Sequence, residues 1–184
     1  ARQLAPGPIS PAQACALFED GRERFNAVTA RTEGLVLWLA PSLGPAQIEH
    51  LARKYAKTNK EWEDDWLRGT PADQLKHRVK QATERFEMLY GDLDEAQISL
   101  LRTELAGASY NARMLRSERL RRQEDILQTL RQVSAGNLSP EAIRESLHAL
   151  LGRLTTPPGP AGKAYAETTL RENCALFARL HNST

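Results

Sequence analysis

The chain has few of the residues, and none of the short motifs, on which most enzyme sites depend. It contains two cysteines and four histidines in 184 residues. The cysteines are not spaced as C-x-x-C, and the histidines lack a second ligand three or four residues further on, so neither thiol redox catalysis nor a metal site is expected. Neither a G-x-S-x-G phrase nor a phosphate-binding glycine loop occurs. The sequence therefore predicts no enzyme activity and no cofactor.

Long apolar runs and an excess of one charge are also missing. The longest apolar run covers residues 34–40, far short of the roughly 20 residues that a membrane-spanning helix needs. Lysine and arginine number 25 against 23 acidic residues, a net charge of +2. A dedicated nucleic-acid-binding protein shows a broad positive field instead. We expect neither a membrane span nor a nucleic-acid partner.

The two ends of the chain bear on its completeness. The sequence opens at Ala1 without an initiator methionine or the charged-then-apolar profile of a signal peptide. It finishes on Asn182, Ser183 and Thr184, residue types that commonly begin another helix. We therefore expect a fragment of a longer protein. Its length predicts a single domain over residues 1–184.

Signals for the start of helices are abundant. An apolar residue is followed by a cap-forming residue, then by proline or an acid, then by alanine or glutamate. This phrase occurs at residues 9–13, 43–47, 93–97 and 138–142, and more loosely at 70–73. Serine or aspartate accepts a hydrogen bond from an otherwise unpaired backbone N–H, and proline has no N–H to leave unpaired. The irregular spacing of the phrases argues against a solenoid of equal repeats.

Between these starts the apolar residues follow helical spacing, and no segment alternates like a strand. We predict an all-α, elongated bundle of about six helices, each with one buried face. The expected helices cover residues 11–40, 45–67, 71–90, 94–134, 140–153 and 161–182.

Two details of this helical pattern stay open. A helix over residues 94–134 would be roughly 60 Å long and central to the bundle, but its apolar stripe changes phase after Leu115, which predicts a kink or a change of packing partner. A break near Thr29 is considered for the first helix. The proline-rich residues 155–160 predict a stiff connector.

Cys15 and Cys174 lie on the apolar faces of the first and last predicted helices, and two interpretations are open. Both are buried free thiols, or they form a disulfide that joins these two helices. A disulfide would close a very long loop and stabilise the fold by about 4–5 kcal/mol in the chain-entropy model. It would also require an oxidising compartment.

A cluster of arginines is the strongest local charge feature. One interpretation is a site for phosphate, anionic lipid headgroups or an acidic partner, because guanidinium groups pair with such groups in bidentate fashion. We favour the other interpretation, in which the arginines point around the whole helix and pair with neighbouring acids such as Glu118. The cluster consists of Arg113, Arg116, Arg119, Arg121 and Arg122.

Aromatic and polar side chains on two other predicted helices are further candidates. Trp62 and Trp66 share one helix face beside an acidic cluster, which is typical of a partner-binding surface but more often of a core. A second set would form polar bridges between helices, because buried polar groups need hydrogen-bond partners. These expected bridges involve Asn59, Arg78, Arg85 and Glu87.

The sequence resembles a family of proteobacterial cell-envelope lipoproteins that is known only as a domain of unknown function. The resemblance spans most of the chain. It rests on the phrase at residues 43–47 with His50, Leu51 and Asn59; on Arg78, residues 85–87 and residues 90–93; and on residues 122–127, Leu130 and residues 177–184.

The resemblance implies a helical domain that a lipid anchor outside this chain holds at the periplasmic side of a membrane. We expect this to be the outer membrane. It supplies no activity. We therefore expect a non-catalytic domain that interacts with or scaffolds other envelope proteins. The alternatives are a periplasmic holdase-like chaperone and the binding of anionic lipid or polymer through residues 113–122, which would weaken steeply with salt.

Overall fold

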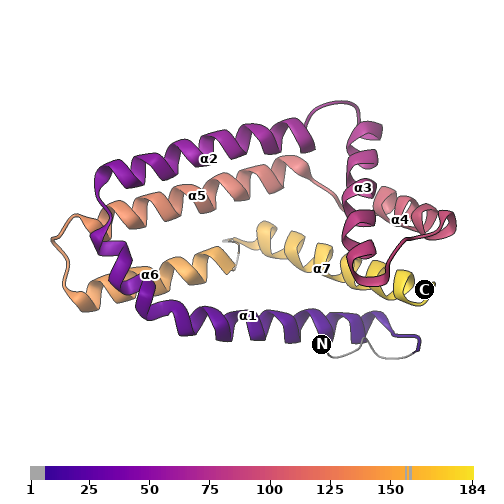
Figure 1. Cartoon of the computed structure of the whole chain (residues 1–184), viewed down its shortest axis with the longest axis horizontal. Helices are drawn as coiled ribbons and strands as arrows, with labels where there is room; N and C mark the ends of the chain where they lie inside the picture. Colours follow the sequence, from indigo (N-terminus) through magenta and orange to yellow (C-terminus); the bar gives the residue numbers. More distant parts are fainter. Residues whose placement is uncertain (1–6, 156, 158) are drawn as a thin grey trace. The chain divides into compact units, whose positions relative to one another are not determined.

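The structure, a computed structural model, describes residues 7–155, 157 and 159–184; of residues 29, 30, 32 and 33 it describes only the backbone. Over these residues it contains helices and no strand, so the chain is an all-α multi-helix bundle, as predicted (Figure 1). The elements are α1 (Pro11–Leu39), η1 (Ala40–Ser42), α2 (Pro45–Trp66), α3 (Pro71–Tyr90), α4 (Glu95–Gly107), α5 (Ala112–Ser134), α6 (Pro140–Thr155) and α7 (Pro160–His181).

The helix starts agree with the capping phrases read from the sequence. Asp94 and Gln97 form a reciprocal capping box at the start of α4, and Thr70 and Asp73 form one at α3. At α1, the Gln13 side chain accepts a hydrogen bond from the backbone N–H of Ser10 at 2.8 Å. Each pairing satisfies N–H groups that the first helical turn leaves without an intrahelical partner. Local chemistry therefore fixes where these helices begin.

The prediction of one central helix over residues 94–134 is wrong. The chain leaves the helical path after Gly107, where the N–H of Ser109 donates to the Glu172 carboxylate at 2.9 Å instead of to a helix carbonyl. Asn111 then starts α5 as its N-cap, since its side chain accepts from the N–H of Met114 at 2.9 Å. The phase change after Leu115 falls inside α5 and so did not mark this break.

The first helix and the proline-rich connector follow the sequence more closely. The backbone of α1 is helical without a break at residue 29. Helix α6 ends at Thr155 and α7 begins at Pro160, as expected for a connector over residues 155–160. Residues 156 and 158 of that connector lie outside the described part of the chain.

The chain divides into two compact units, and each has its own core. Unit 1 comprises Ala1–Glu23, Asp65–Tyr110 and Ala164–Thr184, and unit 2 comprises Arg24–Asp64 and Asn111–Lys163. Both α1 and α2 contribute residues to both units. The expectation of one domain over residues 1–184 stays a prediction.

In unit 1, α7 supplies the buried residues against which the start of α1, α3 and α4 pack (Figure 1). Leu180 and Leu101 are fully buried beside Leu93, and Phe177 is buried beside Ile9. Apolar burial of this kind contributes about 25 cal/mol per Å². The Cys15–Cys174 disulfide joins α1 to α7, with Cα atoms 5.2 Å apart, so the disulfide interpretation is confirmed and that of two free thiols is wrong.

Hydrogen bonds fasten the beginning of unit 1 to its end. The Asn182 side chain accepts from the N–H of Ile9 at 2.8 Å and donates to its carbonyl at 3.0 Å. Nδ1 of His181 lies 2.9 Å from the hydroxyl oxygen of Tyr90, and its ring stacks on Phe177. The Ile9–Asn182 pair holds together residues that are 173 positions apart in sequence.

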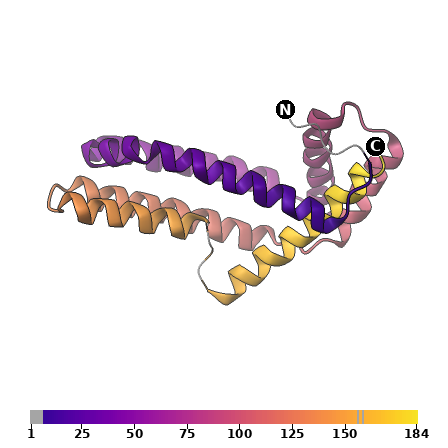
Figure 2. The same ribbon diagram turned by 90° about the horizontal axis from the view of Figure 1, so that it is seen from below.

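In unit 2, α5 lies alongside α2 and α6 (Figures 1 and 2). The core of the unit is formed by Ala40 of η1, Val133 of α5 and Leu147 of α6, with Leu37 packed against it from α1. Side-chain hydrogen bonds also join α2 to α5 and are described below. Unit 2 therefore combines a small apolar core with polar contacts between helices.

Removal of the disulfide should destabilise the fold strongly. The bond spans 159 positions, so its loss restores a large loop entropy to the unfolded chain; we expect the free energy of unfolding to fall by about 3–5 kcal/mol. Urea unfolding of the Cys15→Ser, Cys174→Ser double variant measures it, with reduced wild type as the matched control. A decrease of the free energy of unfolding by less than about 1 kcal/mol would show that the other contacts of unit 1 stabilise the fold without the disulfide.

Candidate functional site

The arginines of α5 are the first candidate, and the structure directs them toward acids and amides of unit 2. Nε of Arg116 lies 2.6 Å from a carboxylate oxygen of Glu63 on α2. Nε of Arg119 donates to the side-chain oxygen of Asn59 at 2.8 Å. Arg121 and Arg122 turn to the other side, toward Glu118. The same arginine cluster therefore serves two helix contacts at once.

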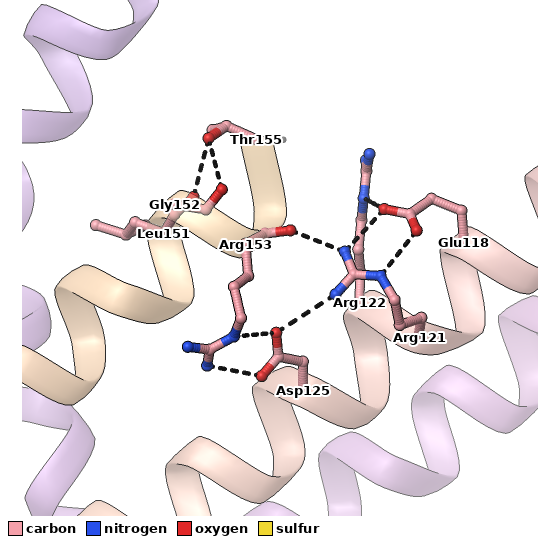
Figure 3. A network of polar contacts seen from close by, with 8 residues as sticks. All are labelled: Glu118, Arg121, Arg122, Asp125, Leu151, Gly152, Arg153 and Thr155. Carbon is pink, nitrogen blue, oxygen red and sulfur yellow. Dashed lines mark hydrogen bonds and ion pairs between the residues drawn. The ribbon is translucent and has the colours of Figure 1, made fainter. Parts of the chain in front are cut away.

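Glu118 and Asp125 organise a network that connects α5 to α6 (Figure 3). Arg121 binds Glu118 with two hydrogen bonds of 2.8 Å, and Arg122 adds a third at 2.7 Å. On α6, Arg153 binds Asp125 with two hydrogen bonds of 2.8 Å, and its own carbonyl accepts from Arg121 at 2.8 Å. Bidentate arginine–carboxylate pairs are the most specific ion pairs in proteins.

The two acids of this network are well shielded for surface residues. The side chain of Asp125 is 16% exposed to solvent and that of Glu118 is 23% exposed. Hydrogen bonds from Arg121 and Arg122 lower the pKa of Glu118, although partial burial opposes them. Hydrogen bonds from Arg153 lower the pKa of Asp125 in the same way. Both carboxylates are therefore held in their charged form.

Asn59 of α2 makes side-chain hydrogen bonds to α5. Its side-chain amide donates to Gln123 on α5 at 2.6 Å, and the Gln123 amide donates back to Asn59 at 3.0 Å. Arg119 shares the same Asn59 oxygen and also reaches the hydroxyl of Thr58 at 3.4 Å. This satisfies the polar groups of a half-buried contact, where an unpaired group would cost about 1–3 kcal/mol.

These contacts leave little of the arginine cluster for an external anion. Four of its five members already bind acids or amides of the same unit, so an anion would have to displace them. Only Arg113 is exposed without an ion pair to a described residue. The geometry thus favours the intramolecular interpretation, and binding of anionic ligands at residues 113–122 stays a prediction.

The two tryptophans of the expected partner surface are half-buried. Trp66, in unit 1, meets the ring of His77 edge-on with ring centres 4.7 Å apart, and the Tyr110 ring lies at 6.4 Å. Trp62 belongs to unit 2. Neither side chain is among the large exposed apolar residues. The two tryptophans therefore do not form an exposed patch in the described part of the chain. Such a patch would have favoured partner binding at this place.

Of the remaining bridges expected in unit 1, Arg78 lies over an aromatic ring and not beside a carboxylate. Its guanidinium carbon is 4.1 Å from the centre of the Tyr110 ring, a cation–π contact. Burial lowers the pKa of Arg78, and the nearby charge of Glu172 opposes that shift. No ion pair of Arg85 or Glu87 occurs among the described residues, so a bridge through these two stays a prediction.

A cavity of about 230 Å³ lies in unit 1 between α4 and α7. It is lined in part by Glu104 and Glu172, but Arg179 binds the first and the N–H of Ser109 binds the second. No histidine or cysteine lines it. Within the described residues, no group of three histidine, cysteine or acidic side chains is placed to hold a metal ion, and no helix is long and apolar enough to cross a membrane.

The feature that sequence reasoning missed is an exposed apolar surface on α1. Its residues belong to unit 2, and the most exposed are Trp38 at 74% and Phe25 and Leu35 at 68% each. The expectation that each helix has one buried apolar face is therefore wrong for this half of α1. We name this surface the α1 stripe; it consists of Phe25, Val28, Leu35, Val36, Trp38 and Leu39.

The α1 stripe is continuous with a face that unit 1 uses for packing. Ala14 is fully buried and Phe18 meets Phe177 edge-on with ring centres 5.5 Å apart. Positions 14, 18, 21, 25, 28, 32, 35 and 39 alternate steps of three and four residues, which places them along one side of the helix. This spacing was the available sequence signal, but it does not distinguish a buried side from an exposed one.

Comparison with known proteins identifies a family and nothing finer. A family model described as a family of unknown function (DUF6279) matches residues 2–151. No curated protein and no solved structure matches the chain. The expected kind of relative, an uncharacterised domain, is thus found, whereas proteobacterial origin and a lipid anchor stay predictions.

Acid should weaken the α5–α6 network. Because the pKa of Glu118 and of Asp125 is lower in the folded chain than the ordinary values of 4.5 and 3.8, the carboxylates stabilise the fold fully above these values. They lose that contribution as the pH falls through the lowered pKa of each. In urea unfolding, a Glu118→Gln, Asp125→Asn variant should have a lower free energy of unfolding than wild type at neutral pH. In acid, where wild type has lost the contribution of both carboxylates, the two free energies should converge.

Glu124 provides the matched control for this measurement. It is an exposed acid of the same helix, with a longer ion pair of 3.7 Å to Arg131, and exposed pairs contribute about 0–1 kcal/mol. Glu124→Gln should leave the pH dependence of unfolding close to that of wild type. An equal effect of the two variants would show that net charge, and not the network, is responsible.

Proposed function

The chain belongs to the DUF6279 family of unknown function, and we propose that it is a non-catalytic helical domain that acts by binding other proteins through α1. The single observation that supports this proposal is the α1 stripe. Large apolar side chains are exposed on this helix at Phe25 and Val28, and again from Leu35 to Leu39. Exposed apolar surface of this kind is typical of interaction sites in folded proteins.

The composition of the α1 stripe supports protein binding. It contains Phe25 at one end and Trp38 near the other, and aromatic residues are enriched at protein interfaces. Arg31 is exposed beside the stripe, and polar residues commonly form the rim of such an interface. The α5 arginines, by contrast, already bind groups of unit 2. The apolar surface is therefore the better candidate for a partner.

We further propose that the domain acts in the bacterial cell envelope, in the periplasm, as part of a lipoprotein anchored to the outer membrane outside this chain. The Cys15–Cys174 disulfide supports this location, because structural disulfides form and persist in oxidising compartments and are rare in the cytosol. The partners would then be other envelope proteins. The anchor itself rests on the family resemblance of the sequence.

A holdase-like chaperone is the second candidate, and the same exposed surface favours it. A holdase binds many unfolded clients through apolar surface, whereas a scaffold binds few partners in a defined geometry. The regular spacing of the α1 stripe favours a defined partner helix. The two functions differ in how many proteins the surface contacts, and the following experiment counts them.

A photo-reactive phenylalanine analogue at position 35 should capture a small number of discrete partners in the native compartment. Leu35 is 68% exposed, so the replacement should leave the fold intact. The same analogue at Asn26, exposed on another side of α1, is the matched control. Discrete adducts from position 35 alone support the proposal, a broad smear favours the holdase, and equal labelling from both positions contradicts both functions.

The proposed compartment predicts the state of the thiols in cells. Protein taken from its native compartment, denatured without reductant and treated with an alkylating label, should gain no label at Cys15 or Cys174. Intact mass measurement counts the labels, and a sample reduced before labelling provides the control with two. Full labelling without reductant would contradict an oxidising location.

A further inference from the structure

We propose that the Cys15–Cys174 disulfide is a redox switch: its reduction by a protein dithiol releases the beginning of α1 from α7 and leaves the rest of unit 1 folded. This inference deepens the proposed function, on which it rests, because the released segment belongs to the helix that carries the α1 stripe. It names the regulation of that surface. Its basis is the way in which this segment is attached to unit 1.

The unit 1 part of α1, residues 11–23, buries very little besides the disulfide. Ala14 is fully buried and Cys15 is half-buried, whereas the other residues of this range are exposed. Phe18 meets the ring of Phe177 edge-on, but it is still 41% exposed. Segments with so few buried apolar contacts open locally at a low cost in free energy. The covalent bond is therefore the main attachment of this segment to α7.

The remainder of unit 1 has a core to which α1 contributes no residue. In the part of the chain that the structure describes, one buried cluster of unit 1 includes Ala14 of α1, and a second cluster lies among α3, α4 and α7. The second cluster is formed by Leu93, Leu101, Leu176 and Leu180. Because this cluster does not depend on α1, it stays packed when α1 leaves. Reduction therefore opens unit 1 locally and does not unfold it.

The bond exchanges with a dithiol in two balanced steps. A thiolate of the dithiol attacks Sγ of Cys15, because Cys15 is half-buried whereas Cys174 is only 1% exposed. The bond between the cysteines breaks, a mixed disulfide with Cys15 forms, and Cys174 leaves as a thiolate that takes up a proton. The second thiolate of the dithiol then displaces Cys15, which is protonated in turn. The chain gains two electrons and two protons, and the dithiol becomes a disulfide.

Release adds apolar side chains to the side of α1 on which the stripe lies. Ala14 and Phe18 share that side with Phe25 and Leu35, because steps of three and four residues follow one helix face. Release also uncovers Phe177 on α7. Since exposed apolar surface is what a partner binds, the reduced chain offers a larger binding surface than the oxidised chain.

The hydrogen bonds between Ile9 and Asn182 make the opening reversible. They involve the backbone N–H and carbonyl of Ile9 at 2.8 and 3.0 Å, and they do not depend on the disulfide. The chain between positions 9 and 15 spans at most roughly 20 Å when it is extended. Cys15 therefore stays near Cys174 after release, and the bond re-forms when the exchange runs in reverse.

Hydrogen–deuterium exchange of the purified chain, oxidised and after reduction with dithiothreitol, tests the local opening. Backbone amides of residues 14–21 should lose protection on reduction, whereas those of α4 should keep it. Loss of protection throughout unit 1, or unchanged protection of residues 14–21, would overturn the inference. The Cys15→Ser, Cys174→Ser variant is the matched control, and it should show the open pattern with and without dithiothreitol.

A variant with one cysteine reports on the release without any reductant. Cys15→Ser leaves Cys174, which packs against Ala14 and is 1% exposed while α1 is in place. Its thiol should react with iodoacetamide in the folded protein nearly as fast as in urea-unfolded protein. A thiol that stays protected until the chain unfolds contradicts the release of α1.

The redox switch and the proposed function can fail separately. If α1 opens on reduction but position 35 captures no discrete protein in either redox state, the switch stands and the proposed function fails. If position 35 captures discrete partners while residues 14–21 stay protected after reduction, the function stands and the switch fails. Opening with equal capture in both redox states overturns the regulation, and opening with stronger capture by the reduced chain supports both proposals.

Discussion

The Cys15–Cys174 disulfide is the contact on which unit 1 depends most. It joins the first turns of α1 to α7, 159 positions later, and around it lie the buried side chains of Ala14, Phe177 and Ala178. Without it, the start of α1 would be held mainly by the Ile9–Asn182 hydrogen bonds and by modest apolar burial. Because disulfides persist under oxidising conditions, the fold is more stable there than under reducing ones.

In unit 2, polar contacts and not a disulfide join the helices. Its apolar core is small, and α5 carries too many charged residues to bury a wide apolar face. Arg116 and Arg119 bind α2, while Arg121 connects to Glu118 and to the end of α6. A charged helix can therefore lie between two neighbours because each guanidinium on those sides meets an acid, an amide or a carbonyl. Four of the five arginines of the cluster therefore make contacts within unit 2.

Helix α1 shows one apolar seam in two environments. Around Phe18 the seam packs against α7 in unit 1, and from Phe25 onward the same spacing continues on an exposed surface. A folded chain rarely leaves this much apolar area on a regular helix face without a use. The exposed half of α1, and not the arginine cluster or the tryptophans, is accordingly where we place the interaction.

The sequence by itself determined the helices and most of their ends, because caps such as Asp94 with Gln97 act within one turn and depend on nothing further away. It also placed Asn59 on a face where a polar group needs a partner. Only the tertiary structure decided which partner each long side chain meets, since the spacing of Arg119 does not reveal that it binds Asn59, 60 positions earlier. Likewise, Ser109 left the helical path because Glu172, 63 positions away, accepts its N–H. The tertiary structure also decided that Leu35 is exposed, because the periodicity of a sequence shows which residues share a helix face but not whether another element packs on that face.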